Sequence, residues 1–340
     1  MFYYNASKLS TEGLNMYFGG NIIIDLVGIF SNNFALSYVN TSLIFSSLGF
    51  TGILIYSKII KDLLYDLPKR YNLIYYLILF SPSLHFWSSL IGKDNLCLFL
   101  ISLIILSLIN ICKNKKYYFL LLLFSLIIIF LVRAHFGLVI IAGISLSTLL
   151  MILRKTYFGI MIFILMTTLG LYGLNFVVDY IQSNYSYEGG ISEVLFEISD
   201  VFANTEDNTF QINYTPLFSE LRYLIAPFPN FEGGIFSIIS AIELIPYFFL
   251  FFRPILVSSN VIRKMNLQRI LRSIKTNFLT ASFFIIPVMF IIILSATSYN
   301  LGVVIRQRAV VSPFYIIPFL IYLRFINGLK PLGFDGFKSI

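Results

Sequence analysis

Apolar runs of about eighteen to twenty residues recur along the chain, and they limit its possible folds more than any other feature. A hydrocarbon layer of about 30 Å needs about 20 helical residues to cross it. Hydrophobic residues make up 58% of the 340 residues and charged residues only 12%, which is not the composition of a soluble domain. We therefore expect an all-α fold: a polytopic transmembrane helical bundle that forms one integral-membrane domain over residues 1–340.

The apolar runs predict nine spans plus one doubtful short segment, so about nine to ten in all. The predicted spans are residues 38–56, 71–90, 96–111, 117–132, 136–153, 157–178, 235–252, 278–296 and 311–326. Residues 1–20 are interpreted as a polar arm. Residues 21–30 contain Asp25 and are too short to cross, so they are expected to be interfacial or re-entrant. One long loop, 179–234, and one basic loop, 253–275, connect the later spans.

The distribution of basic residues predicts the orientation. Alternating the loops places 18 of the 24 lysines and arginines on one side, which the positive-inside rule makes cytoplasmic. The 253–275 loop is then cytoplasmic, and the acidic 179–234 loop faces the opposite side. The net charge of +8 is explained by topology anchors, and no nucleic-acid partner is expected.

Four basic residues lie on the outer side at helix ends: Lys93, Arg133, Arg306 and Arg308. Exposure to lipid would cost each about 2.5–3.5 kcal/mol on insertion scales. One interpretation is that each side chain reaches the headgroups independently. The alternative is that the four converge on a bound polyanion.

The segment Gly92-Lys93-Asp94-Asn95 is expected to begin a helix, with Asp94 or Asn95 as its N-cap and Asp94 alternatively a salt-bridge partner. Free backbone N–H groups beside a lysine are typical of phosphate sites.

Residues 300–308 are expected to form a polar turn, with Asn300 at its start. In an extended segment Arg306 and Arg308 would share one face, whereas on a helix they would point about 200° apart. Both alternatives remain open. Arginine forks suit diphosphate oxygens.

Two carboxylates and two histidines complete the candidate site. Glu232 precedes a predicted span, and Glu243 lies inside it, where it is either functional or paired with an outer cation. His85 and His135 fall at outer helix ends, where each is either a hydrogen-bonded structural residue or a proton acceptor. Two histidines without a set of carboxylates do not indicate a metal site, so no metal and no cofactor are expected.

Four motifs resemble one family in their order along the chain. They are PSLHFWSSLIGKD (82–94), VRAHFGL (132–138), APFPNFEGG (226–234, with Glu243 following) and NLGVVIRQRAVVSPF (300–314). Together they resemble O-antigen and capsule repeat-unit polymerases of the Wzy type and, more distantly, lipid-sugar-dependent glycosyltransferases of the GT-C class. Two positions depart from the pattern. Ala226 stands where related chains often have arginine, and only Glu12 or Asp25 could supply the acidic residue usual in the first outer loop of GT-C enzymes.

The resemblance implies an enzyme of the bacterial inner membrane whose active site faces the periplasm. It would polymerise oligosaccharide repeats carried on undecaprenyl diphosphate, and a chain-length regulator is a candidate partner beside the bilayer. Lys93, Arg133, Arg306 and Arg308 would bind the diphosphate. Cations at this position would stabilise the negative charge that develops on the leaving diphosphate, which gives Arg306 and Arg308 a catalytic role as well.

Glu232 is the first candidate for the base that takes a proton from the acceptor hydroxyl, and His135 is the second. His85, Trp87, Asp94, Glu243 and Asn300 would have supporting roles.

Two other functions use the same features. A transferase that adds a single sugar from a polyprenyl-phosphate donor would need the same cations. A flippase or transporter would instead place charges near the midplane and have paired repeats with broken helices. No internal repeat is visible in the sequence, and the unusual charges gather at one face, which favours an enzyme.

Overall fold

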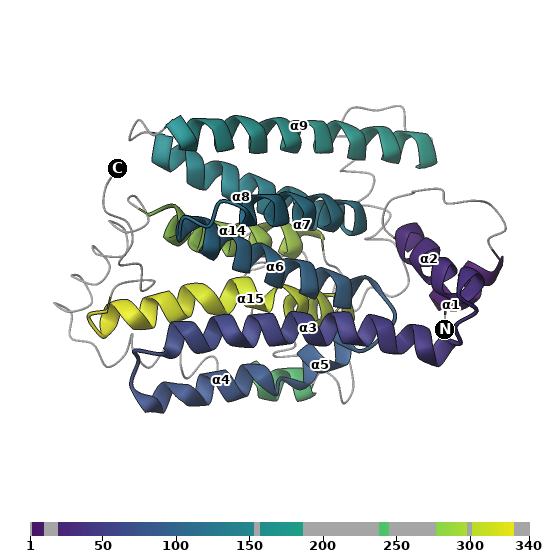
Figure 1. Ribbon diagram of the computed structural model, residues 1–340, viewed down its shortest axis with the longest axis horizontal. Helices are drawn as coiled ribbons and strands as arrows, with labels where there is room; N and C mark the ends of the chain where they lie inside the picture. The colour runs from purple at the N-terminus through teal and green to yellow at the C-terminus, as the bar shows by residue number, and fades with distance from the viewer. Residues whose placement is uncertain are drawn as a thin grey trace.

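The computed structural model describes residues 2–9, 20–152, 157–185, 238–244, 277–297 and 301–329. All regular secondary structure in these ranges is helical, and no strand occurs among them, which confirms the expected all-α class. Most helices run roughly parallel along the long axis, whereas α1 and α2 lie at one end beside the start of α3 (Figure 1).

In chain order, the described helices are α1 (Phe2–Leu9), α2 (Gly20–Gly28), the π-helical turn η1 (Ile29–Asn33), α3 (Tyr38–Leu64), the 3₁₀ turn η2 (Lys69–Tyr71), α4 (Asn72–Leu79), α5 (Pro82–Ser88), α6 (Lys93–Cys112), α7 (Tyr118–Val132), α8 (Ala134–Ile152), α9 (Tyr157–Tyr185), α14 (Phe278–Thr297) and α15 (Leu301–Ile326). Residues 238–244 form a further helical segment between α9 and α14.

Four of the described helices, α3, α6, α14 and α15, are long and apolar enough to cross a membrane. Helices α7, α8 and α9 contain shorter apolar stretches. These helices indicate a membrane protein, and the nine to ten predicted spans stay a prediction. The predicted span 235–252 lies outside the described residues except for 238–244, and the 253–275 loop lies wholly outside them. Helix α9 continues to Tyr185, past the predicted loop start at Asp179, and the remainder of that loop is outside the described residues.

Large apolar side chains point outward from several of these helices. On α3, Val39, Leu43 and Phe50 are 53% exposed or more, and on α7 Leu120 and Phe124 are similarly exposed. Such surfaces are unfavourable in water, but in a bilayer the lipid tails replace the water. The exterior therefore has the character expected of the membrane-facing surface of a bundle.

Helix α6 is the central element of the bundle. It packs against α3, α7 and α15, and Figure 1 shows it between α3 and the α7–α8 pair. It is apolar all round, so its buried residues, such as Ile101, Ile104 and Leu108, face several neighbours. Gly52 of α3 permits a close approach to α6, because a Cβ there would lie 2.8 Å from the Cα of Phe99. Small residues at such crossings are common between membrane helices.

The predicted span 71–90 is wrong as one continuous helix. The structure divides it into the end of η2, α4 and α5, with the break at Ser81. Ser81 caps α5 by accepting a hydrogen bond from the backbone N–H of Leu84, and Pro82 occupies the first helical turn. Proline suits this position because it has no N–H to leave unpaired.

Two predictions at the ends of the chain also need correction. The expected polar arm 1–20 includes helix α1, which packs against α2. The expected polar turn 300–308 is helical from Leu301, so Arg306 and Arg308 both lie on α15. Packing of Val304 and Ile305, which are buried, stabilises this first part of α15 and outweighs the turn propensity of its sequence.

Candidate anion site at one end of the helix bundle

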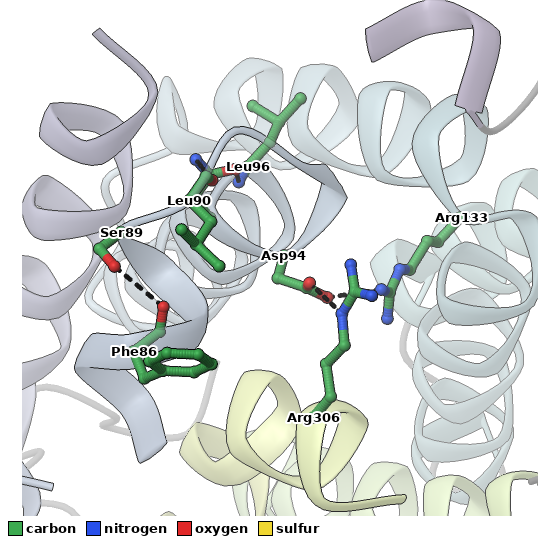
Figure 2. Close-up of polar contacts among 8 residues, drawn as sticks. Phe86, Ser89, Leu90, Asp94, Leu96, Arg133 and Arg306 are labelled. Atoms are coloured by element: carbon green, nitrogen blue, oxygen red, sulfur yellow. Dashed lines mark hydrogen bonds and ion pairs between the residues drawn. The ribbon is translucent and has the colours of Figure 1, made fainter. Parts of the chain in front are cut away.

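Three helix ends bring Lys93, Asp94, Arg133 and Arg306 together, and we call these four residues the Asp94 cluster. Asp94 Oδ1 accepts a hydrogen bond from Arg133 Nη2 at 2.5 Å, and Asp94 Oδ2 accepts one from Arg306 Nε. Figure 2 shows the carboxylate pointing between the two guanidinium groups. The charges of Arg133 and Arg306 also act on the Lys93 ammonium, which places the third cation in the same cluster.

The local structure explains why the carboxylate lies at this position. Helix α6 begins at Lys93 with the extended residue Gly92 as its N-cap, so neither Asp94 nor Asn95 is the cap that the sequence predicted. Asp94 lies in the first turn, where the helix dipole favours a negative charge. Asn95 instead donates a hydrogen bond from Nδ2 to the carbonyl of Leu90 at 2.8 Å and so holds the α5–α6 connection.

The arginines reach Asp94 from two other elements. Arg133 is the single residue between α7 and α8, and Arg306 lies in the second turn of α15. The side chain of Asp94 is 4% exposed, that of Arg133 9% and that of Arg306 33%. The cluster is thus closed on the Arg133 side and open on the Arg306 side.

The cluster has more donors and more positive charge than its own residues satisfy. Two arginines bond one carboxylate, and Lys93 adds a third positive charge to the cluster. Arg133 Nη1 is buried and has no hydrogen-bond partner, and Lys93 has none either, within the described part of the chain. A buried donor without an acceptor is costly, and a guanidinium carries five N–H groups in a planar fork. The arrangement therefore suits a bound anion with several oxygen atoms.

An aromatic ring lies beside each arginine of the cluster. The Arg306 guanidinium lies 5.4 Å from the centroid of the Trp87 ring, and that of Arg133 lies 4.9 Å from the Phe136 ring. At Gly92, a Cβ would lie 3.9 Å from Arg306 Nη2 and 4.0 Å from Tyr3 Cε2. Tyr3 of α1 is not among the sequence-predicted site residues, because nothing local to residues 1–20 connects them to α6.

Arg308 contacts a different part of the protein from the other three predicted cations. Its Nη2 donates to Ser240 Oγ at 2.7 Å, in the helical segment 238–244. Arg306 and Arg308 point in different directions because residues two apart on a helix are separated by about 200°. The structure thus brings together Lys93, Arg133 and Arg306, and it joins Arg308 to the neighbouring segment.

Glu243, in the helical segment 238–244, bonds the start of α5. Its Oε1 accepts hydrogen bonds from the backbone N–H of Ser83 at 2.8 Å and from Ser81 Oγ at 3.0 Å. The carboxylate therefore supplements the N-cap of a helix, a position that the helix dipole favours. Glu243 forms no ion pair with a described lysine or arginine. Because α5 carries Trp87, Glu243 acts on the cluster indirectly, by stabilising the helix that positions the Trp87 ring.

The two histidines differ in their surroundings. His85 Nε2 is 2.6 Å from the carbonyl oxygen of Leu79, a hydrogen bond that ties α5 to the end of α4. His135 is the second residue of α8 and lies two positions after Arg133, near the cations of the cluster. Of the two candidate bases, His135 is the one within the described residues, and it lies beside the cluster.

Two predicted site residues, Glu232 and Asn300, lie outside the described residues. Over the described ranges, no three histidine, cysteine, aspartate or glutamate side chains gather as a metal site would require. Asp25 of α2 has a buried Oδ2 without a hydrogen-bond partner among the described residues, and burial raises the pKa of this carboxyl.

Comparisons of the chain with protein-family models, with curated proteins and with solved structures find no match. The family resemblance of the four motifs therefore stays a prediction from the sequence.

Proposed function

We propose that this protein is a membrane glycosyltransferase that polymerises oligosaccharide repeat units carried on undecaprenyl diphosphate. The observation that carries the proposal is the Asp94 cluster: three cations at one end of an apolar bundle, with unused donors that face one carboxylate. In this proposal the cluster binds the diphosphate at the periplasmic face of a bacterial inner membrane, and the isoprenoid chain lies along the apolar helices.

The proposed chemistry needs positive charge fixed in place before the reaction. Breaking a glycosyl–phosphate bond builds negative charge on the leaving diphosphate, and preorganised donors lower the barrier most where charge develops. Arg133 and Arg306 are held in place by Asp94, and Arg306 is also held by Trp87, so little reorganisation is required. Removing one such donor typically costs about 10²–10³ in rate.

The acceptor sugar must lose a hydroxyl proton during transfer. His135 lies beside the cluster and is our described candidate for the base, with Glu232 as the alternative. Arg308 would have an indirect role, because its bond to Ser240 links α15 to the segment that follows the long acidic loop. That loop would hold the acceptor glycan.

The position of the cluster supports an enzyme over a flippase. Lys93 is the first residue of α6, and Arg133 lies between two helices. A transport pathway would be expected to have its charges near the midplane. A transferase that adds one sugar from a polyprenyl monophosphate remains the second candidate, because the same cations would serve it.

The proposal is tested by Arg306→Ala in cells that produce the polysaccharide. We expect loss of long-chain polysaccharide on a gel while immunoblots show a normal amount of protein in the membrane. Lys58→Ala, an exposed lysine in the second half of α3, is the matched control and should leave the banding unchanged. Normal long chains in the Arg306→Ala strain would overturn the proposal. Loss of a single sugar rather than of the ladder would favour the single-sugar transferase.

A further inference from the structure

We propose that Asp94 is a built-in counterion with which the diphosphate competes, so that the carboxylate keeps the affinity of the cluster moderate and helps to release the leaving diphosphate. The inference rests on the proposed function for the identity of the anion. It adds a regulatory role for a residue that would otherwise be only a salt-bridge partner.

The cluster is buried on its Arg133 side and has an excess of positive charge. Lys93, Arg133 and Arg306 would repel one another strongly if no anion were near, because Arg133 is 9% exposed and little water can screen it. Asp94, at 4% exposure, supplies one negative charge. The cluster can therefore remain assembled when its ligand has left.

The carboxylate of Asp94 divides its bonds between two partners. It gives one oxygen to Arg133 and the other to Arg306, so neither arginine receives the stronger two-bond fork. Each contact is a single hydrogen bond that a diphosphate oxygen can replace or share. A carboxylate engaged through a fork would be harder to displace.

Several donors remain for a ligand once Asp94 is bound. Arg133 uses Nη2 for Asp94 and leaves Nη1 buried without a described partner, and Arg306 uses Nε. Lys93 has no described acceptor. These donors belong to three elements around one carboxylate, so a ligand with two phosphate groups could contact all three cations while it lies beside Asp94. The bound diphosphate and the carboxylate then repel each other, which weakens binding.

This arrangement has a consequence for turnover. A site with three unopposed cations would hold the product diphosphate tightly and release it slowly. With Asp94 present, the arginines regain a counterion as the diphosphate departs. Removing the charge of Asp94 should tighten binding and slow release, whereas a purely positioning role would predict weaker binding.

The experiment measures the affinity of the purified full-length protein in detergent for sodium pyrophosphate and for farnesyl diphosphate. Asp94→Asn keeps the shape of the side chain and removes its charge, so we expect both ligands to bind about tenfold more tightly than to the wild type. Asp94→Glu keeps the charge and should bind with nearly wild-type affinity. Asp66→Asn removes the aspartate paired with Arg324, which lies in the last turn of α15 whereas Arg306 lies in the second, and should leave both affinities unchanged.

The outcomes separate this inference from the proposed function. If neither the wild type nor Asp94→Asn binds either ligand, the diphosphate site itself is refuted. If the wild type binds and Asp94→Asn binds equally or more weakly, only the counterion role is refuted. A marked preference for farnesyl diphosphate over pyrophosphate would assign the site to a lipid-linked diphosphate, and equal affinities would assign it to the anion alone.

The stability of Asp94→Asn provides a second readout. The variant leaves three cations without their counterion, so we expect it to be recovered best when an anion replaces the lost charge. Recovery of monodisperse Asp94→Asn with pyrophosphate in every buffer, but not without it, would support the counterion role. If the variant cannot be recovered either with or without pyrophosphate, the counterion role is overturned, because an added anion then fails to replace the lost charge.

Discussion

Helix α15 carries three arginines, and two of them, Arg306 in its second turn and Arg324 in its last turn, each bond an aspartate from elsewhere in the chain. In the last turn, Arg324 donates from Nη1 to the carbonyl of Leu63 and from Nη2 to Asp66, each at 2.8 Å. In the second turn, Arg306 shares Asp94 with Arg133, and Lys93 adds a further cation. The same residue type on one helix is thus used in two different ways.

The two ends differ in how completely their charges are satisfied. Arg324 has one carboxylate to itself, and Asp66 is 47% exposed and remains hydrated. Asp94 is buried and serves two arginines, and the cluster around it has an excess of positive charge. A balanced pair of this kind fastens α15 to the end of α3, whereas an unbalanced cluster favours a ligand. A buried arginine by itself therefore does not indicate a binding site.

The largest expected effect on stability comes from Asp94, and Asp66 at the other end of α15 provides the comparison. Asp94→Ala leaves a buried arginine and its neighbours uncompensated, a class of change that costs about 3–5 kcal/mol. Asp66→Ala should cost about 1 kcal/mol, because the Leu63 carbonyl still accepts from Arg324. Thermal unfolding in detergent measures both. Equal losses would contradict the difference between the two ends.

An intermediate effect is expected from removing the arginines while keeping their apolar bulk. Arg324→Met loses at least the hydrogen bonds to Leu63 and Asp66 and should destabilise the protein by about 2 kcal/mol without changing pyrophosphate binding. Arg306→Met leaves Asp94 paired with Arg133, so stability should fall by less than about 1 kcal/mol while pyrophosphate binding is largely lost. Binding assays and unfolding on the same samples test this crossover. If Arg324→Met loses pyrophosphate binding although the unfolding assay shows that the sample is folded, this crossover is contradicted.

The smallest effect concerns Asp25, a carboxylate of α2 for which the described residues offer no arginine partner. Burial raises the pKa of Asp25 in the folded protein, so the ionised form costs stability at neutral pH. Asp25→Asn should therefore stabilise the protein slightly at pH 7. The gain should shrink as the pH falls and vanish below the pKa of an ordinary carboxyl group, where wild-type Asp25 is protonated in both states.

Unfolding temperatures of the Asp25→Asn variant and the wild type across this pH range test the sign. A variant that is less stable than the wild type at pH 7 would show that Asp25 has a counterion, as Asp94 has.

Several features of the fold are predictable from the sequence because they depend on local properties. The apolar runs at 117–132 and 278–296 correspond closely to α7 (Tyr118–Val132) and α14 (Phe278–Thr297). The apolar runs do not predict the break at Ser81, although the Ser-Pro pair is a recognisable start signal for a helix. The structure follows this start signal rather than the continuous apolar character of the flanking residues.

The candidate site is predictable only in part. Lys93, Arg133 and Arg306 stand out because cations at apolar helix ends are unusual, whatever the fold. The same criterion also selects Arg308, whose hydrogen bond to Ser240 depends on the helical geometry of α15. It gives no information on Tyr3, since an aromatic residue in a polar segment resembles many others.

The sequence by itself determined that this chain forms apolar helices of membrane-spanning length and that a few cations would lie at their ends. Both follow from residue composition over short windows. Only the tertiary structure decided that Asp94 would serve Arg133 and Arg306, which are 39 and 212 positions away along the chain. Such pairings depend on how α6, α7 and α15 pack, and packing is a property of the whole bundle rather than of any segment.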